Sequence, residues 1–263
     1  MKILLLGGDG FIGRNIAEAL PGNFRRYSLG RSPSPFKTND NLFIKADIYN
    51  DRIDEFFDVY IHLIDNDPGR ELFLIENINP NAHVILFSSA VIYANPLSEY
   101  AQRKRQLEKV YGEHCKKLTI LRLFNVYGRY QIPRRQGSLI ANILYNHVNN
   151  IPIEINNMNT ERDFMFAGDI AKYIESIIEH SLYGTYDLAT GSMYSLKKLC
   201  AVIQSALSIK LNIVELKQTA DSGCPHAARI VPCNVQNCSL EFGLEKTFDF
   251  FRKNNEILKE LLS

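Results

Sequence analysis

The sequence has no long apolar run, no excess of charge of either sign and no regular cysteine spacing. No apolar stretch approaches the ~18 residues of a membrane span, and the first one ends at Gly7, too early for the core of a signal peptide. The formal net charge of +1 gives no electrostatic basis for binding nucleic acid or a membrane surface. The five cysteines form no Cys-x-x-Cys pair, which predicts reduced thiols in a cytoplasmic protein and no metal site.

The composition and the apolar pattern are those of a soluble globular enzyme with alternating strands and helices. The 263 residues, 46% of them hydrophobic, suffice for one large domain or one and a half. After an N-terminal apolar run, the segments expected to form buried strands are 24–29, 42–46, 59–64, 83–87 and 118–124. Helical patterns lie between some of these strands, the clearest of them at 98–115. This alternation predicts an α/β fold built on a Rossmann-type, doubly wound parallel sheet.

The chain after residue 125 has a different pattern. Helices are expected at 138–148, 169–180 and 196–207, mixed with short strands such as 153–155 and 186–188. We therefore expect a dinucleotide-binding domain over residues 1–128 and a smaller α/β portion over 129–263. The second portion should mainly bind substrate at the carboxyl ends of the strands, with some segments returning to the Rossmann core.

The first fourteen residues carry the most specific motif. An apolar run meets glycines at 7, 8, 10 and 13, and an amphipathic segment follows at once. This order is that of a strand, a tight turn and a helix start, which places a dinucleotide pyrophosphate on backbone N–H groups and on the helix dipole. The residues expected to contact the dinucleotide are Gly7, Gly10, Phe11, Ile12 and Gly13. A glycine-rich turn without a ligand is the alternative.

A second set of residues suits hydride chemistry at a carbinol or carbonyl carbon. Tyr100 and Lys104 stand four positions apart, so a helix places them on one face. A lysine ammonium beside a phenol favours the phenolate and so lowers the pKa of the phenol. Ser89 lies where a strand is expected to end, and its hydroxyl can bind a substrate oxygen. Ser89, Tyr100 and Lys104 are the expected catalytic residues, with Tyr100 and Lys104 also facing the cofactor. Each of these features alone is common.

Five further segments complete a pattern that covers nearly the whole chain, namely 45–48, 58–63, 121–128, 160–169 and 184–191. With them the chain resembles the extended short-chain dehydrogenase/reductase superfamily, in its NAD(P)-dependent nucleotide-sugar epimerase, dehydratase and reductase branch. For substrate binding, the resemblance implies that Ser89 and Asn125 face the sugar and that Arg162 contacts the nucleotide diphosphate. Arg229 precedes a segment that is loosely similar to the C-terminal arginine segment of the family. The resemblance also implies a homodimer.

For the cofactor, the resemblance implies that Asp47 faces the adenine and that Ile48 and Leu63 contact the dinucleotide. The end of the second strand lacks the acidic residue that would bind the ribose 2′-hydroxyl of NAD. Arg31 and Ser32 stand there instead, and they can bind a 2′-phosphate. NADP is therefore favoured over NAD, although Arg31 stacking on the adenine of NAD is the alternative.

Three departures from the family pattern bear on function. The segment 65–81 and the interval from Ser89 to Tyr100 are short, which predicts a trimmed pocket rim or an unusual substrate, or else a neutral loop deletion. Ala90 and Val91 replace the Asp-Glu pair of the family's dehydratases and cannot transfer protons, so dehydration is not expected.

The expected function is NAD(P)-dependent oxidoreduction of a nucleotide-linked sugar. Reduction of a 4-keto sugar is favoured over 4-epimerisation, because an epimerase recycles its cofactor in place and needs no NADPH pool. The alternative of another class is a non-catalytic NADP-binding sensor or scaffold. Such a protein would have no need of Lys104 to lower the pKa of the Tyr100 phenol.

Overall fold

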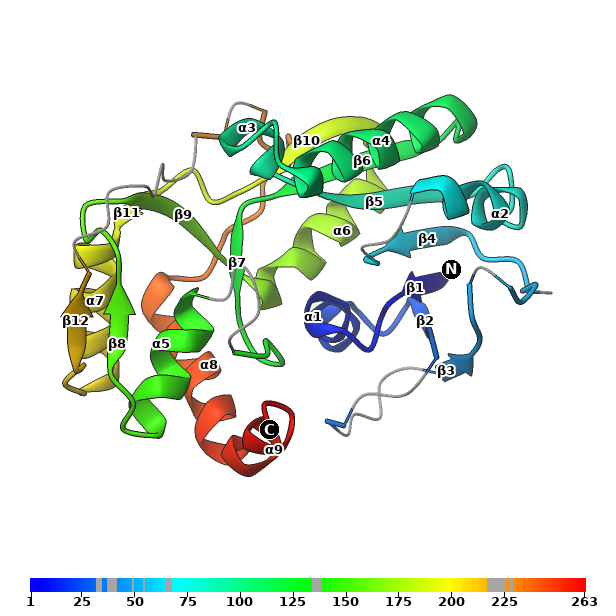
Figure 1. The fold of residues 1–263 in the computed structure, drawn as a ribbon. Helices are drawn as coiled ribbons and strands as arrows, with labels where there is room; N and C mark the ends of the chain where they lie inside the picture. Colours follow the sequence, from blue (N-terminus) through cyan, green and yellow to red (C-terminus); the bar gives the residue numbers. More distant parts are fainter. Residues whose placement is uncertain are drawn as a thin grey trace.

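A parallel sheet of seven strands forms the centre of the protein (Figure 1). The computed structural model describes residues 1–31, 35–36, 42–48, 50–53, 55–64, 68–133, 139–216, 226–227 and 229–263. Its central sheet has the order β10-β6-β5-β4-β1-β2-β3. The strands are β1 (Lys2–Leu6), β2 (Arg25–Gly30), β3 (Leu42–Lys45), β4 (Val59–His62), β5 (His83–Ser89), β6 (Leu118–Leu123) and β10 (Gly184–Leu188). The predicted Rossmann-type sheet is thereby confirmed.

Helices cover both faces of the sheet, as the term doubly wound requires. On one face, α1 (Phe11–Ala19) and α6 (Ile170–Glu179) share a core with alternate residues of the strands, such as Ile3 and Ile85. On the other face, α2 (Glu71–Glu76) and α4 (Glu99–His114) pack on the residues of opposite parity, such as Leu4 and Leu86. Because β1, β4 and β5 lie in the middle of the sheet and are buried on both faces, each reads as a nearly continuous apolar run.

The strand order reverses between β1 and β4, and this point positions the site. From β1 the chain proceeds outward to β2 and β3, then returns to β4 on the other side of β1. Parallel sheets of this kind bind ligands at such a reversal, beyond the carboxyl ends of the strands. The residues that follow β1 and β4 there are Gly7 and Leu63.

A second core lies beyond the carboxyl end of β6. It contains a three-stranded sheet, β11-β9-β7, and a two-stranded sheet, β12-β8. These strands are β7 (Asn125–Tyr127), β8 (Ile153–Ile155), β9 (Glu161–Phe166), β11 (Met193–Ser195) and β12 (Ile213–Glu215). The helices around them are α5 (Leu139–Val148), α7 (Leu196–Leu207), α8 (Leu240–Lys253) and α9 (Asn255–Glu260). Figure 1 shows this part as a unit to one side of the central sheet.

Most of the expected segments differ from the structure by one or two residues at their ends, and one of them also differs in its place. The strand expected at 186–188 begins at Gly184 and pairs with β6, so it forms the edge of the central sheet. The helix expected at 169–180 is α6, preceded by a 3-10 turn, Ala167–Asp169. Position 138, at the start of another expected helix, and Ser32 lie outside the described residues, as do residues 65–67.

Candidate functional site

The glycine turn joins β1 to α1 in a close-packed arrangement. Gly7 has φ +83°, a left-handed conformation that favours glycine, and a Cβ there would lie 2.9 Å from Ile64 Cγ1. A Cβ on Gly13 would lie 2.5 Å from Gly8 Cα, so Gly13 lets the helix pack directly on the turn. Both glycines are therefore explained by the fold alone.

Gly10 is different, because among the described residues a Cβ on it would meet only the carbonyl oxygen of Gly7, at 3.2 Å. Gly10 is also the N-cap of α1 and adopts an extended backbone, with φ −78° and ψ 177°. The space in front of it is the place where backbone N–H groups of a first helical turn can bind phosphate. The residues of this turn therefore fit a dinucleotide pyrophosphate, and Phe11 and Ile12 lie in the first turn of α1 as expected from the sequence.

The turn also contains a carboxylate, Asp9, whose charge is partly balanced. Ser28 Oγ of β2 donates a hydrogen bond of 3.2 Å to Asp9 Oδ2, and Arg14 Nη1 lies 3.9 Å from Asp9 Oδ1. The Arg14 side chain is 3% exposed and lies over the Tyr130 ring, 4.6 Å from its centroid. Arg14 thus places positive charge beside the turn and offsets the repulsion that Asp9 would exert on a phosphate.

The remaining residues expected at the cofactor follow the next strands. Arg31 directly follows β2 and is exposed, while Asp47 and Ile48 follow β3 in a turn closed by Asn50 N–H donating to the Asp47 carbonyl, 3.0 Å away. Leu63 follows β4, and its N–H donates to the carbonyl of Leu6 at 3.0 Å. All four lie after the carboxyl ends of their strands, around the reversal point.

Ser89 is the last residue of β5 and leads into a one-turn helix, α3 (Val91–Ala94). Its Oγ accepts a hydrogen bond of 3.2 Å from the N–H of Val91. The hydroxyl therefore keeps its proton available to donate to a second oxygen.

Tyr100 and Lys104 lie in the first two turns of α4, which begins at an N-cap formed by Ser98. Ser98 Oγ accepts a hydrogen bond of 3.2 Å from the N–H of Ala101. Lys104 is only 5% exposed, and its Nζ lies 3.5 Å from the carbonyl oxygen of Phe87 and 5.6 Å from the centroid of the Tyr100 ring. The fold thus brings a buried ammonium between the Tyr100 ring and β5, two residues before Ser89.

Asn125 and Arg162 meet on the small sheet beyond β6. β7 and β9 pair in parallel, and Arg162 Nη1 donates to Asn125 Oδ1 at 3.3 Å. Asn125 Nδ2 donates in turn to the carbonyl of Asp163 at 3.1 Å. The two side chains expected at the substrate are therefore adjacent.

The structure does not bring Arg229 to this pair. The backbone of Arg229 joins Asp187 of β10, with Asp187 N–H donating to the Arg229 carbonyl at 2.7 Å. Its guanidinium lies over Tyr186, 5.2 Å from the ring centroid, and beside Gly184 at the start of β10. The start of a parallel strand is the end opposite to the ligand-binding edge.

Sequence reasoning missed a polar network behind α3. Tyr93 OH donates to Asp187 Oδ1 at 2.9 Å and accepts from Arg122 Nη1 at 2.6 Å. Arg122 also holds both carboxylate oxygens of Glu108 on α4, at 2.9 and 2.6 Å. Partial burial raises the pKa of the Tyr93 phenol, an effect that Arg122 opposes and Asp187 reinforces. The signal in the sequence is weak, because these four residues come from four separate elements.

Asp163 was also missed, although it follows Arg162 directly. Successive residues of a strand point to opposite faces, so Asp163 is turned away from Asn125 and is 1% exposed. Its carboxylate accepts hydrogen bonds from the N–H and hydroxyl of Thr190, at 3.0 and 2.8 Å, and from the N–H of Gly191 at 2.7 Å. Asp163 thereby fixes the turn that follows β10.

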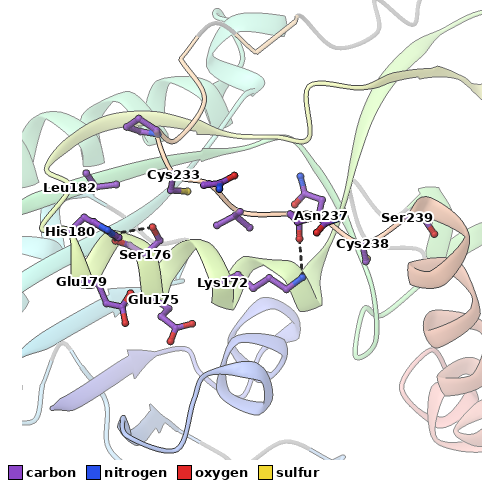
Figure 2. Close-up of a pocket in the computed structure, with 14 residues that line it drawn as sticks. Lys172, Glu175, Ser176, Glu179, His180, Leu182, Cys233, Asn237, Cys238 and Ser239 are labelled. Carbon is purple, nitrogen blue, oxygen red and sulfur yellow. Dashed lines mark hydrogen bonds between the residues drawn. The ribbon is translucent and has the colours of Figure 1, made fainter.

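An open groove of about 880 Å³ lies elsewhere, between α6 and the segment that carries Cys233 and Asn237 (Figure 2). The described residues that line it include none of the residues expected at the site. Its lining ends at His180 and Leu182, which lead into the start of β10. The groove is therefore not where the strand ends place a dinucleotide.

Within the described part of the chain, no helix is both long and apolar enough to cross a membrane. No group of three or more His, Cys, Asp or Glu side chains among these residues is placed to hold a metal ion.

Comparisons with known proteins find similarity to one family over the middle of the chain. The sequence model of the NAD dependent epimerase/dehydratase family matches residues 81–202. A UDP-2-acetamido-2,6-beta-L-arabino-hexul-4-ose reductase of Pseudomonas aeruginosa is 27% identical over 211 residues, which are 74% of this chain and 54% of that reductase. The match thus spans about half the length of this curated relative.

Two solved structures share the fold. MoeE5 in complex with UDP-glucose and NAD has a TM-score of 0.80 at 18% identity, covering 97% of this chain and 100% of the other. A UDP-N-acetylglucosamine 4-epimerase from Methanobrevibacter ruminantium M1, in complex with UDP-N-acetylmuramic acid, has a TM-score of 0.77 at 20% identity, covering 96% and 98%. At these identities the likeness is one of fold.

Proposed function

We propose that this chain is a member of the NAD dependent epimerase/dehydratase family and that it reduces a 4-keto group on a nucleotide-linked sugar. The observation that carries the proposal is the position of Lys104, a buried ammonium 5.6 Å from the centroid of the Tyr100 ring and 3.5 Å from the backbone of β5. A non-catalytic binding protein has no need of such a pair. The similar reductase of Pseudomonas aeruginosa acts, by its name, on a nucleotide-linked 4-ulose.

The dinucleotide would lie along the glycine turn, with its pyrophosphate in the space before Gly10. The bound nicotinamide supplies the hydride that reduces the sugar carbonyl carbon. NADP is the proposed cofactor. Arg31 stands near the position where an acidic residue would select NAD, and the planar guanidinium of Arg31 suits a 2′-phosphate. Asp47, Ile48 and Leu63 would line the rest of this site. MoeE5, with the same fold, carries NAD.

The protein's own groups would move one proton. Tyr100 donates it to the oxygen that becomes the sugar hydroxyl, while Ser89 donates a hydrogen bond to the same oxygen. Lys104 favours the phenolate that remains and holds the cofactor ribose. Ala90 and Val91, which follow Ser89, have no proton to transfer, so loss of water from the sugar is not part of the proposal.

The substrate would lie across the residues after position 128, with Asn125 facing it. Arg162 would bind the diphosphate through its guanidinium, which Asn125 already holds at 3.3 Å. Arg229 has no direct part in this proposal, since its guanidinium lies over Tyr186. We also propose a homodimer, which light scattering of the purified protein would test.

Epimerisation at C4 is the second candidate, because the same three residues would first accept and then return the proton. The fold is shared with the 4-epimerase of Methanobrevibacter ruminantium. Incubation of the purified protein with NADPH or NADH and a panel of nucleotide-linked 4-keto sugars separates the possibilities. Stoichiometric oxidation of NADPH supports the reductase. Interconversion of 4-epimers without net oxidation supports the epimerase, and binding without turnover supports a sensor.

A further inference from the structure

Three side chains on the α4 face of the sheet form a fully buried hydrogen-bonded cluster. Glu71 Oε2 accepts from Tyr111 OH at 2.8 Å and lies 3.0 Å from His62 Nε2. The rings of His62 and Tyr111 also meet edge to face, with centroids 5.4 Å apart. All three residues are 0% exposed. We call them the Glu71 cluster.

The hydrogen bonds define the role of each member. A buried carboxylate is stable only where donors surround it, and here the donors are the Tyr111 hydroxyl and the Nε2–H of His62. Within the described part of the chain His62 Nδ1 has no hydrogen-bond partner, which assigns the proton shared with Glu71 to Nε2. Glu71 therefore acts as the acceptor that holds both neighbours.

The cluster links the two elements on which the proposed chemistry depends. His62 is the last residue of β4, directly before Leu63 at the reversal point. Tyr111 lies on α4, seven residues after Lys104 and on the same buried face, about two helical turns away. Glu71 begins α2 and comes from the segment between β4 and β5 that is short for this family.

We infer that Glu71 is a positioning residue, which ties α4 to the end of β4 and thereby sets Tyr100 and Lys104 against Ser89. This inference rests on the proposed roles of those three residues. The short segment between β4 and β5 then has a function, since it places the Glu71 carboxylate against Tyr111 of α4. Arg122 fixes α4 to β6 in a similar way through Glu108, so the helix is held from two strands.

The first test measures the position of α4 without any substrate. In Tyr111→Phe, which keeps the ring and removes the donor to Glu71, amide hydrogen exchange in the first two turns of α4 should accelerate about fivefold or more. The matched control is Tyr173→Phe, because Tyr173 is 3% exposed, donates to Asn237 Oδ1 at 3.1 Å and lies on α6, on the opposite face of the sheet. That variant should leave exchange in α4 unchanged. Unchanged exchange in Tyr111→Phe as well would overturn the inference, whatever the enzyme's activity.

The second test uses catalysis and distinguishes positioning from general stability. In Glu71→Leu, kcat should fall about tenfold or more with KM nearly unchanged. The alkaline limb of the pH profile of kcat, which reports Tyr100, should also move up by about one pH unit, toward the ordinary tyrosine pKa of ~10. Glu71→Gln keeps an acceptor oxygen and should restore most of the rate. If kcat instead fell equally in Glu71→Leu and Glu71→Gln and the alkaline limb did not move, the role of Glu71 would be merely structural. An inactive wild-type enzyme would contradict the proposed function, while the hydrogen-exchange comparison of Tyr111→Phe with Tyr173→Phe would still test the role of the Glu71 cluster.

Discussion

Arg162 Nη1 donates a hydrogen bond of 3.3 Å to Asn125 Oδ1, which joins two residues 37 positions apart on the paired strands β7 and β9. The contact orients a guanidinium before any substrate arrives. Preorganisation of this kind lowers the entropic cost of binding a diphosphate. This pair is the contact on which we base the proposal of a nucleotide-linked substrate.

We expect Arg162→Ala to raise the KM for the nucleotide sugar about ten- to 100-fold, the effect of losing a charge-assisted contact of ~1.5–3 kcal/mol. The Kd for the dinucleotide should stay the same, because Arg162 lies outside the glycine turn. Steady-state kinetics and calorimetric titration measure the two quantities. Arg229→Ala is the matched control, and an equal loss in both variants would contradict the assignment of Arg162.

Gly10→Val should abolish dinucleotide binding while the protein stays folded. Among the described residues the new Cβ would meet only the Gly7 carbonyl oxygen, at 3.2 Å, but the branched side chain would fill the space proposed for the pyrophosphate. Calorimetric titration and a thermal melt check both parts. Gly22→Val is the control, since a Cβ on Gly22 meets no atom of the described residues within 4 Å. Full dinucleotide affinity in Gly10→Val would refute the placement.

The sequence predicted the glycine turn, the central strands and α4 because each depends on local pattern. Ser98 caps α4, and the four-residue spacing of Tyr100 and Lys104 needs only the helix to become a shared face. The direction of the Arg229 side chain was not predictable. It follows from the pairing of its backbone with Asp187, 42 residues away, and such pairing has no local signal.

The Glu71 cluster was equally hidden from the sequence. Glutamate is almost never fully buried unless it has partners, and those of Glu71 come from β4 and α4, 9 and 40 residues away. The place of β10 at the sheet edge is likewise a tertiary property, set by its register with β6.

Arg31→Ala should weaken NADP binding about tenfold or more and leave NAD binding nearly unchanged. The expected loss is that of a charged bidentate contact to a 2′-phosphate, ~1.5–3 kcal/mol. Fluorescence titration with both dinucleotides gives the comparison. Equal weakening of the two would instead mean that Arg31 stacks on the adenine, and the preference for a net reductase would lose its main support.

Acid should destabilise the protein through His83. Burial, aided by Lys117, lowers the pKa of His83 to about 4. Its Nε2 lies 2.7 Å from Thr119 Oγ1, which donates its own proton to the Leu182 carbonyl and so accepts from His83. In the unfolded chain the pKa of a histidine is ~6.5. Between pH 4 and ~6.5, His83 is therefore protonated in the unfolded state and neutral in the folded state.

The stabilising effect of neutral His83 is therefore complete above pH ~6.5 and is lost as the pH falls toward 4, in total roughly 3 kcal/mol. Urea denaturation at a series of pH values measures it. His83→Gln keeps a donor for Thr119 and should flatten this part of the profile. An unchanged slope in that variant would assign the acid sensitivity to other groups.

The central claim is that Tyr100 transfers a proton during hydride transfer, and Tyr100→Phe tests it most directly. This change removes one hydroxyl and keeps the ring beside Lys104, so the dinucleotide Kd should be nearly that of the wild type. In single-turnover reduction of a nucleotide-linked 4-keto sugar by NADPH, the rate should fall ~10²–10⁴-fold, the usual loss of a general acid. A Tyr100→Phe enzyme that turns over at the wild-type rate would contradict the account.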